Sequence, residues 1–191
     1  MSEAVRTRRW TRGEYDRLVE HGIFAAGERI ELLGGLLVVR EPQGGRHAMG
    51  VRMVEEALRA AFGSGWDVRG QLPVALDAES EPEPDVSVVP GSFRDYPLEH
   101  PARAVLVVEI ADSSLALDRG EKAGLYARAR VPEYWIVNLV DRTLEVHRES
   151  APDAGAPFGS RYREIVTLRP GETVVALAAP DTVIAVADLV P

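Results

Sequence analysis

Cysteine is missing from this 191-residue chain. Its absence excludes disulfide bonds, thiolate metal sites and cysteine nucleophiles, and it fits a reducing compartment. The chain also lacks a run of about 18 consecutive apolar residues, and no apolar stretch follows the charges near its start, so neither a membrane span nor a secretory signal is indicated. We therefore expect a cytoplasmic protein without membrane contact.

Basic residues are fewer than acidic ones. The chain has 22 Lys and Arg residues against 30 Asp and Glu residues, and its formal net charge is −8. Repulsion from a polyanion counts against DNA or RNA as a partner unless basic residues cluster locally. Lysine occurs once, as Lys122, whereas the other 21 basic residues are arginine. The sequence therefore raises the question of what role this single lysine has.

Several familiar catalytic motifs are also missing. The chain has no GxSxG elbow, no HExxH, no GxxxxGK and no GxGxxG. Ser113 and Ser114 have no histidine near them in sequence, and serines ahead of a helix are typical of turns and caps. Nothing in the sequence therefore favours a serine hydrolase, a zinc protease or a dinucleotide-binding enzyme.

What is present indicates an α/β fold, a mixed sheet flanked by a few helices, in one domain over residues 1–191. Thr11 and Glu14 have capping-box spacing at the start of a first helix. Helices are also expected over 47–62, where Met49, Met53, Ala57 and Ala61 would face a sheet, and over 119–129, capped by Asp118. The expected strands are 29–33 and 36–40 as a hairpin, 66–76, 85–89, 104–110, two strands within 133–149, and three short strands after a loop at 151–160.

Two acidic residues indicate chemistry in this sheet. Glu109 lies near the end of the continuously apolar run AVLVVEI, which predicts a central strand, and a buried carboxylate needs a partner. Asp85 begins its own strand directly after Pro84. Carboxylates from neighbouring strands can hold a divalent cation such as Mg²⁺. The alternative is that Glu109 pairs with an arginine and that Asp85 only starts a turn.

Lys122 favours a site over that alternative. At about 100° per residue, Leu125 and Tyr126 fall on its side of the helix, so the lysine faces inward, where a cation needs an acidic partner. A lysine ammonium is a compact point charge that can orient or deprotonate a water and stand against charge that develops on a phosphate.

The order Pro84-Asp85, then Glu109, then DRGEK leading into LYARARVPEYWIVN resembles the Uma-type family of restriction endonucleases, within the PD-(D/E)XK nuclease superfamily. The resemblance covers roughly residues 10 to 150. It implies a restriction-endonuclease-like fold with extra C-terminal strands, and Mg²⁺-dependent hydrolysis of DNA phosphodiester bonds, with Mn²⁺ as a possible substitute.

The resemblance also implies roles for individual residues. Asp85 and Glu109 would bind the metal, together with the Ile110 carbonyl, and Lys122 would position the attacking water or stabilise the transition state. Glu31 matches an upstream acidic position that often completes the site; its alternative is an outward-facing strand residue. His47 would approach a phosphate from a helix N-terminus, or would only start its helix.

The chain departs from the superfamily pattern at three positions. The usual lysine lies two residues after the glutamate, where this chain has Ala111, so Lys122 would be its counterpart on the following helix. Arg130 stands where a glycine often ends that helix, and in a left-handed conformation it would cost about 1 kcal/mol. Asn138 replaces a frequent aspartate.

Two functions are compatible with these residues. The first is a metal-dependent DNA endonuclease, for which a symmetric homodimer would supply the two active sites that cutting both strands requires. The alternative is an inactive nuclease-fold module that binds nucleic acid or a protein partner. The complete set of two acids and a lysine favours the enzyme.

Overall fold

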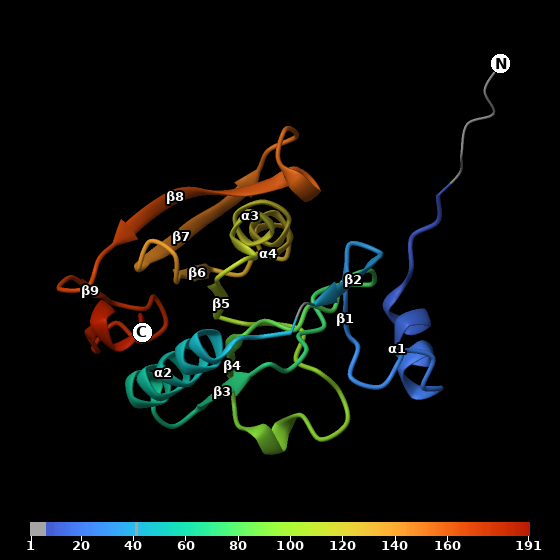
Figure 1. Ribbon diagram of the computed structural model, residues 1–191, viewed down its shortest axis with the longest axis horizontal. Coiled ribbons are helices and arrows are strands. Elements are labelled where there is room, and N and C mark those ends of the chain that lie inside the picture. The colour runs from blue at the N-terminus through green and yellow to red at the C-terminus, as the bar shows by residue number, and fades with distance from the viewer. Residues whose placement is uncertain (1–6, 41) are drawn as a thin grey trace.

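The computed structural model describes residues 7–40 and 42–191. A six-stranded sheet with the order β3-β4-β5-β6-β7-β8 forms its centre (Figure 1). Its strands are β3 Trp66–Gly70, β4 Val86–Pro90, β5 Leu106–Ala111, β6 Glu133–Asn138, β7 Thr143–Pro152 and β8 Ser160–Leu168. Only β5 and β6 pair in parallel, and the other neighbours are antiparallel. The sheet is therefore mixed, as the sequence predicts.

Strand β5 lies in the interior of this sheet, and all six of its residues are buried. Val107 and Ala111 pack on one face of the sheet, whereas Val108 and Ile110 pack on the other. Because alternate residues of a strand share a face, Glu109 points toward the same face as Val107 and Ala111. The prediction of a central strand with a buried glutamate is confirmed.

The connection from β5 to β6 is a helical run that covers this face. It consists of α3 Leu115–Leu117, η2 Asp118–Lys122 and α4 Ala123–Arg128, and η2 is a π-helical turn in which the amide of Ala123 donates to the carbonyl of Asp118. Figure 1 shows the run end on, between β6 and the long β7–β8 hairpin. The helix thus begins four residues earlier than predicted, so the expected capping role of Asp118 is wrong.

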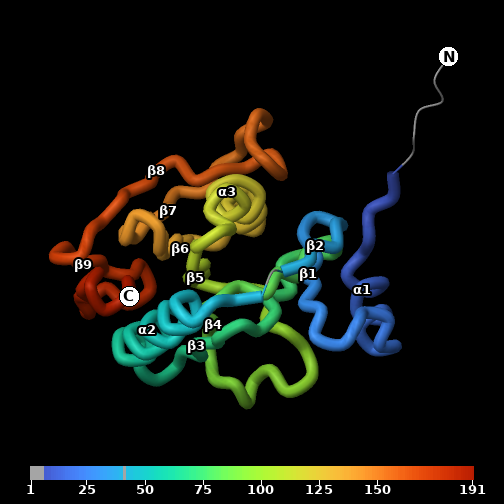
Figure 2. The backbone as a smooth tube through the Cα atoms, in the orientation of Figure 1, coloured from blue at the N-terminus to red at the C-terminus, as the bar shows by residue number. Residues whose placement is uncertain are grey.

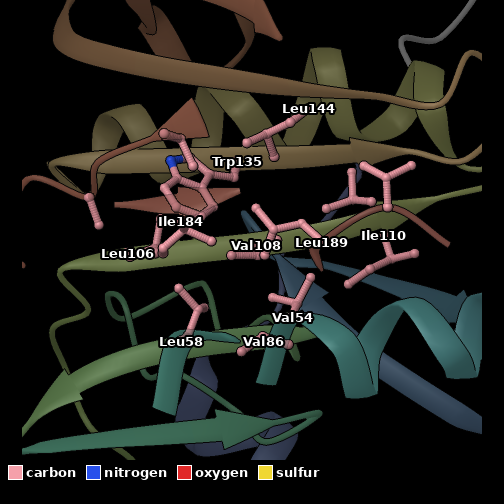
Figure 3. Close-up of a cluster of buried hydrophobic side chains, with 14 of the residues drawn as sticks. Val54, Leu58, Val86, Leu106, Val108, Ile110, Trp135, Leu144, Ile184 and Leu189 are labelled. Carbon is pink, nitrogen blue, oxygen red and sulfur yellow. The ribbon is translucent and has the colours of Figure 1, made fainter. Parts of the chain in front are cut away.

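The other face is covered by α2 Gly45–Phe62 and the C-terminal segment, which lie side by side (Figure 2). Val54 and Leu58 of α2 point at the sheet, and Ile184 and Leu189 close the same cluster (Figure 3). The predicted inward face is correct only in part: Ala57 and Ala61 pack against this cluster, whereas Met49 is 55% exposed. The branched side chains of α2 set its rotation instead.

A hairpin of β1 Arg29–Leu33 and β2 Leu36–Arg40 lies beside the main sheet, next to α1 Arg12–Glu20 (Figure 1). Gly34 and Gly35 both have positive φ, as a two-residue hairpin turn requires. The capping box of Thr11 and Glu14 is present. Both predictions are confirmed.

The remaining elements depart from the sequence prediction in length. The predicted strand 66–76 ends at Gly70, and β8 is nine residues long rather than short, whereas β9 Thr173–Val174 and β10 Ile184–Ala185 form a small separate pair. Short 3-10 turns complete the chain: η1 Phe93–Asp95, η3 Pro157–Gly159 and η4 Val186–Asp188. None of the helices in the described part of the chain is long and apolar enough to cross a membrane.

Candidate active site

A pocket of about 330 Å³, which we call the active-site pocket, opens where the hairpin, α2 and the β5–α3 connection meet. It is lined by Glu31, Val38, Val39, Arg40, Pro42, Gln43, Gly44, His47, Asp85, Glu109, Asp112, Ser113, Ser114, Leu117, Asp118 and Lys122. All five residues predicted to form the site line it, although they come from five separate segments of the chain.

Asp85 and Glu109 lie opposite each other on neighbouring strands. The antiparallel register of β4 and β5 pairs Val86 with Val108, so the residues one step outward, Asp85 and Glu109, face each other across the ladder. Each is only 2% exposed. The expectation that the two acids meet on adjacent strands is confirmed.

Asp85 is held by hydrogen bonds. Its Oδ1 accepts from Arg40 Nη2 at 2.8 Å and lies 3.1 Å from His47 Nε2, and its Oδ2 accepts from the Ile110 amide at 2.8 Å. Burial raises the pKa of Asp85, but the His47 hydrogen bond and the Arg40 charge outweigh it and hold the pKa below its usual range. Asp85 is therefore a carboxylate in the folded protein.

Glu109 has different partners. Its Oε1 accepts from Lys122 Nζ at 3.0 Å and from the Tyr126 hydroxyl at 2.7 Å. Burial raises the pKa of Glu109, the Lys122 charge lowers it, and the charges of Asp85 and Asp118 raise it again, with a net upward shift. An added positive charge at this position would favour the ionised form of Glu109.

Lys122 bridges two acids. Its Nζ lies 3.2 Å from Glu31 Oε1 as well as 3.0 Å from Glu109 Oε1, and the residue is 3% exposed. Burial lowers the pKa of Lys122, but Glu109, Glu31 and Asp118 raise it by more, so the ammonium keeps its charge. Helical phasing thus placed this lysine on the correct side.

Glu31 is an inward-facing residue of β1, 1% exposed, and the alternative of an outward-facing residue is wrong. Its second oxygen, Oε2, accepts from the Glu83 amide at 3.1 Å, which fixes the carboxylate against the pocket. His47, the third residue of α2, is 9% exposed and contacts Asp85. Both residues belong to the same charged network as the predicted metal ligands.

Sequence reasoning missed three polar residues of the pocket. Asp118, 1% exposed, accepts from the Ser114 hydroxyl at 2.5 Å, and its spacing of four residues from Lys122 is a signal that could have found it. Arg40 ends β2 and Gln43 follows it, and Gln43 Nε2 lies 3.3 Å from Asp85 Oδ1. No local pattern marks either residue.

The donors fit one divalent cation. Within residues 7–40 and 42–191, no three His, Asp or Glu side chains converge at metal-binding spacing, but Mg²⁺ commonly takes one or two carboxylates and keeps several waters. The pocket holds four buried carboxylates and two cationic side chains: Glu31, Asp85, Glu109 and Asp118 against Arg40 and Lys122. When all six are ionised they carry an excess of two negative charges, to which the exposed Asp112 of the lining adds, so the pocket attracts a divalent cation.

The chain matches a family model and a solved structure. A family model, Uma2, described as "Putative restriction endonuclease", matches residues 12–187. A crystal structure of "a putative nuclease belonging to DUF820" from Anabaena variabilis ATCC 29413 superposes with a TM-score of 0.69 at 15% identity, covering 94% of this chain and 96% of the other. That likeness shows the fold, a mixed α/β nuclease fold. No curated protein matches the chain.

Proposed function

The chain belongs to the Uma2 restriction endonuclease family, and from this membership and the geometry of the pocket we propose that it is a metal-dependent DNA endonuclease that hydrolyses phosphodiester bonds. One observation carries the proposal: Asp85, the residue just before β4, accepts from the Ile110 amide next to Glu109 on β5, and the only lysine of the chain lies 3.0 Å from Glu109.

The proposed division of labour follows from the contacts. Asp85 and Glu109 would hold Mg²⁺, or Mn²⁺, through their carboxylate oxygens. When bound, such a cation lowers the pKa of a water and offsets charge on the phosphoryl oxygens. Lys122 supplies a fixed ammonium that can orient the attacking water or oppose the charge that develops on the phosphate. Glu31, 3.2 Å from the ammonium, adds a second negative charge that helps to keep Lys122 protonated.

A DNA substrate must overcome the net charge of −8. Neutralising the four buried carboxylates of the pocket, by Lys122, Arg40 and one divalent cation, would remove the strongest local repulsion at the point where a phosphate has to enter. DNA binding should therefore depend on metal, and should weaken steeply with salt.

Cleavage of supercoiled plasmid DNA tests the proposal. Mg²⁺ or Mn²⁺ should permit nicking and EDTA should stop it, whereas Asp85→Asn, Glu109→Gln and Lys122→Met should each abolish it in samples that circular dichroism shows to be folded. Glu133→Gln is the matched control, because Glu133 is a buried carboxylate of β6 that pairs with Arg148 and is not among the residues lining the pocket.

Calorimetric titration with Mg²⁺ or Mn²⁺ separates the enzyme from an inactive nuclease-fold module. The enzyme should bind the cation in a manner that Asp85→Asn removes. If the native protein binds no cation through Asp85 and cuts no DNA, the proposal is wrong and the binding module stands.

A duplex cut on both strands requires two sites, so we also propose a two-fold symmetric dimer as the active form. Analytical ultracentrifugation in the presence of metal and a non-cleavable DNA duplex measures the stoichiometry. A complex that contains a single protein chain, together with double-strand cleavage at the same concentration, would refute the dimer.

A further inference from the structure

The carboxylate of Asp85 has donors on both of its oxygens. Oδ2 accepts from the Ile110 amide at 2.8 Å. Oδ1 lies 2.8 Å from Arg40 Nη2, 3.1 Å from His47 Nε2 and 3.3 Å from Gln43 Nε2. A cation that binds Asp85 must therefore share or displace one of these donors.

The donors differ in how easily a cation could displace them from Asp85. The Ile110 amide belongs to the backbone of β5, which is hydrogen-bonded on both sides within the sheet, so Oδ2 keeps its partner. Arg40 stands at the end of β2, which, among the strands that the structure describes, pairs only with β1. Its guanidinium is always charged, so a divalent cation at Oδ1 would repel it. Arg40 is the donor that metal binding should dislodge.

Once displaced from Asp85, Nη2 of Arg40 needs another acceptor, whereas Nη1 already lies 4.0 Å from Glu83 Oε2. The side chain of Arg40 is only 10% exposed, lines the active-site pocket, and is anchored at Nη1 by the Glu83 carbonyl at 2.6 Å. With Nη1 held by Glu83, Nη2 is the nitrogen that can change its partner within the pocket. Phosphate is the ligand that the planar fork of an arginine matches, since two parallel N–H groups can bind two phosphate oxygens.

We propose that Arg40 is a phosphate-binding residue of the active site: it neutralises Asp85 in the metal-free protein, and transfers to a phosphate oxygen of the DNA when a cation takes Asp85. This inference rests on the proposed nuclease function and adds to it. Arg40 thus has two anionic partners in turn, and its removal should have opposite effects on the two ligands.

Arg40→Gln separates this role from a structural one. Without the competing guanidinium, metal should bind Asp85 more tightly, whereas DNA should bind more weakly because a charge-assisted hydrogen bond is lost. Each effect should be about tenfold or more. An arginine that only supports the fold would, when removed, weaken both ligands together.

Arg29→Gln is the matched control. Arg29 lies opposite Arg40 in the register of the hairpin and pairs with the same residue, since its Nη2 lies 3.1 Å from Glu83 Oε2. It is not among the described residues that line the pocket. The control removes the same charge from the same hairpin, and we expect it to leave metal and DNA affinity within about twofold of the native protein.

The experiment uses two titrations of the full-length protein. Calorimetry with Mn²⁺ in the absence of DNA gives the metal affinity, and fluorescence anisotropy with a labelled 20-base-pair duplex in Ca²⁺ gives DNA affinity. Tighter Mn²⁺ binding with weaker DNA binding in Arg40→Gln, and neither change in Arg29→Gln, is the expected result.

Two outcomes would overturn the inference. If Asp85→Asn removes Mn²⁺ binding but Arg40→Gln leaves both affinities unchanged, the nuclease proposal stands and the role of Arg40 falls. If Asp85→Asn has no effect on Mn²⁺ binding, both fall. If Arg40→Gln does not fold, Arg40→Lys replaces it in the experiment. Lysine keeps the charge but lacks the two parallel N–H groups of the guanidinium, so DNA affinity should drop severalfold without loss of metal affinity. An unchanged DNA affinity would refute the inference.

Discussion

Replacing Lys122 by methionine should destabilise the metal-free protein by about 3–5 kcal/mol, because it removes the cation from a buried cluster and leaves its carboxylates uncompensated. Methionine matches the shape of the lysine stem without its charge. Lys122 is 3% exposed, and its partners Glu31 and Glu109 are 1% and 2% exposed, so the lost contacts lie largely out of bulk water. The loss is a large share of the ~5–15 kcal/mol by which domains are usually stable.

Lys122→Arg keeps the charge but does not separate a catalytic role of Lys122 from a structural one. A guanidinium is larger than an ammonium, and Lys122 is 3% exposed and packed between two carboxylates, so overpacking should cost about 1–3 kcal/mol whatever the role of Lys122. Loss of activity in this variant would not separate chemistry from packing. Stability measurements on Lys122→Met avoid that ambiguity.

The assay is urea unfolding at pH 7 in EDTA, followed by tryptophan fluorescence, since Trp135 is fully buried in the core. Lys122→Met combined with Glu31→Gln should recover most of the loss, because the amide carries no charge and can still accept from the Glu83 amide, as Glu31 Oε2 does now. Arg161→Met, which breaks an exposed ion pair with Asp153, is the control and should cost less than about 1 kcal/mol.

The pH dependence gives a second measure. Burial raises the pKa of Glu109 and Lys122 lowers it, so Lys122→Met raises it further. A carboxyl whose folded pKa lies above its unfolded value of ~4.3 stabilises the fold at low pH, and loses that contribution as the pH rises through the folded pKa. Because the pKa of Glu109 in the native protein is raised to about 8, the deficit of the variant should grow as the pH rises above about 8, by up to ~1.4 kcal/mol per pH unit. A deficit below about 1 kcal/mol at pH 7 that also stays constant with pH would refute the reasoning.

Three further variants test the surroundings of the site by the same unfolding assay. Arg130→Gly should stabilise the protein by about 1 kcal/mol, because Arg130 has φ 58° at the end of α4; an unchanged midpoint would contradict the strain. Gly124→Ala should destabilise by about 1–3 kcal/mol, since its Cβ would lie 2.4 Å from the Pro157 carbonyl oxygen, and a neutral result would mean that the β7–β8 hairpin can move away. Tyr126→Phe should cost about 1.5–3 kcal/mol by removing the 2.7 Å hydrogen bond to Glu109. A smaller loss would mean that Lys122, and not Tyr126, stabilises the buried Glu109 carboxyl.

The parts of the fold that the sequence predicted correctly are those with a local physical cause. The run of β5, apolar apart from Glu109, identifies a strand covered on both faces, and Gly34-Gly35 identifies a two-residue hairpin, because in each case neighbouring residues determine the conformation. The rotation of α2 was misjudged because Met49 and Met53 are as apolar as the valines that the helix buries. Which apolar stripe turns inward depends on the shape of the sheet.

The residues of the site also differ in whether a local feature of the sequence marks them. Asp85, Glu109 and Lys122 could be predicted because each is an exception in its own segment, an acid at the boundary of an apolar strand or a lone lysine on an inward face. Arg40 is no exception, since it ends a strand on the partly exposed hairpin, and its contact with Asp85 spans 45 residues of sequence. Only the tertiary structure reveals that contact.

The position of the lysine has a packing explanation. Glu109 and Ala111 point toward the same face of β5, and on that face Ala111 is fully buried in one cluster with Ala123 and Tyr126 of α4. A lysine at position 111 would have to fit beneath the helix, where an alanine on each side allows close approach. Lys122 lies instead at the end of the π-helical turn, one residue before α4, and reaches Glu109 from above the strand. π turns occur mostly as single-turn bulges inside α-helices and are frequent at functional sites, and the π turn in DRGEK ends at the residue whose ammonium reaches Glu109.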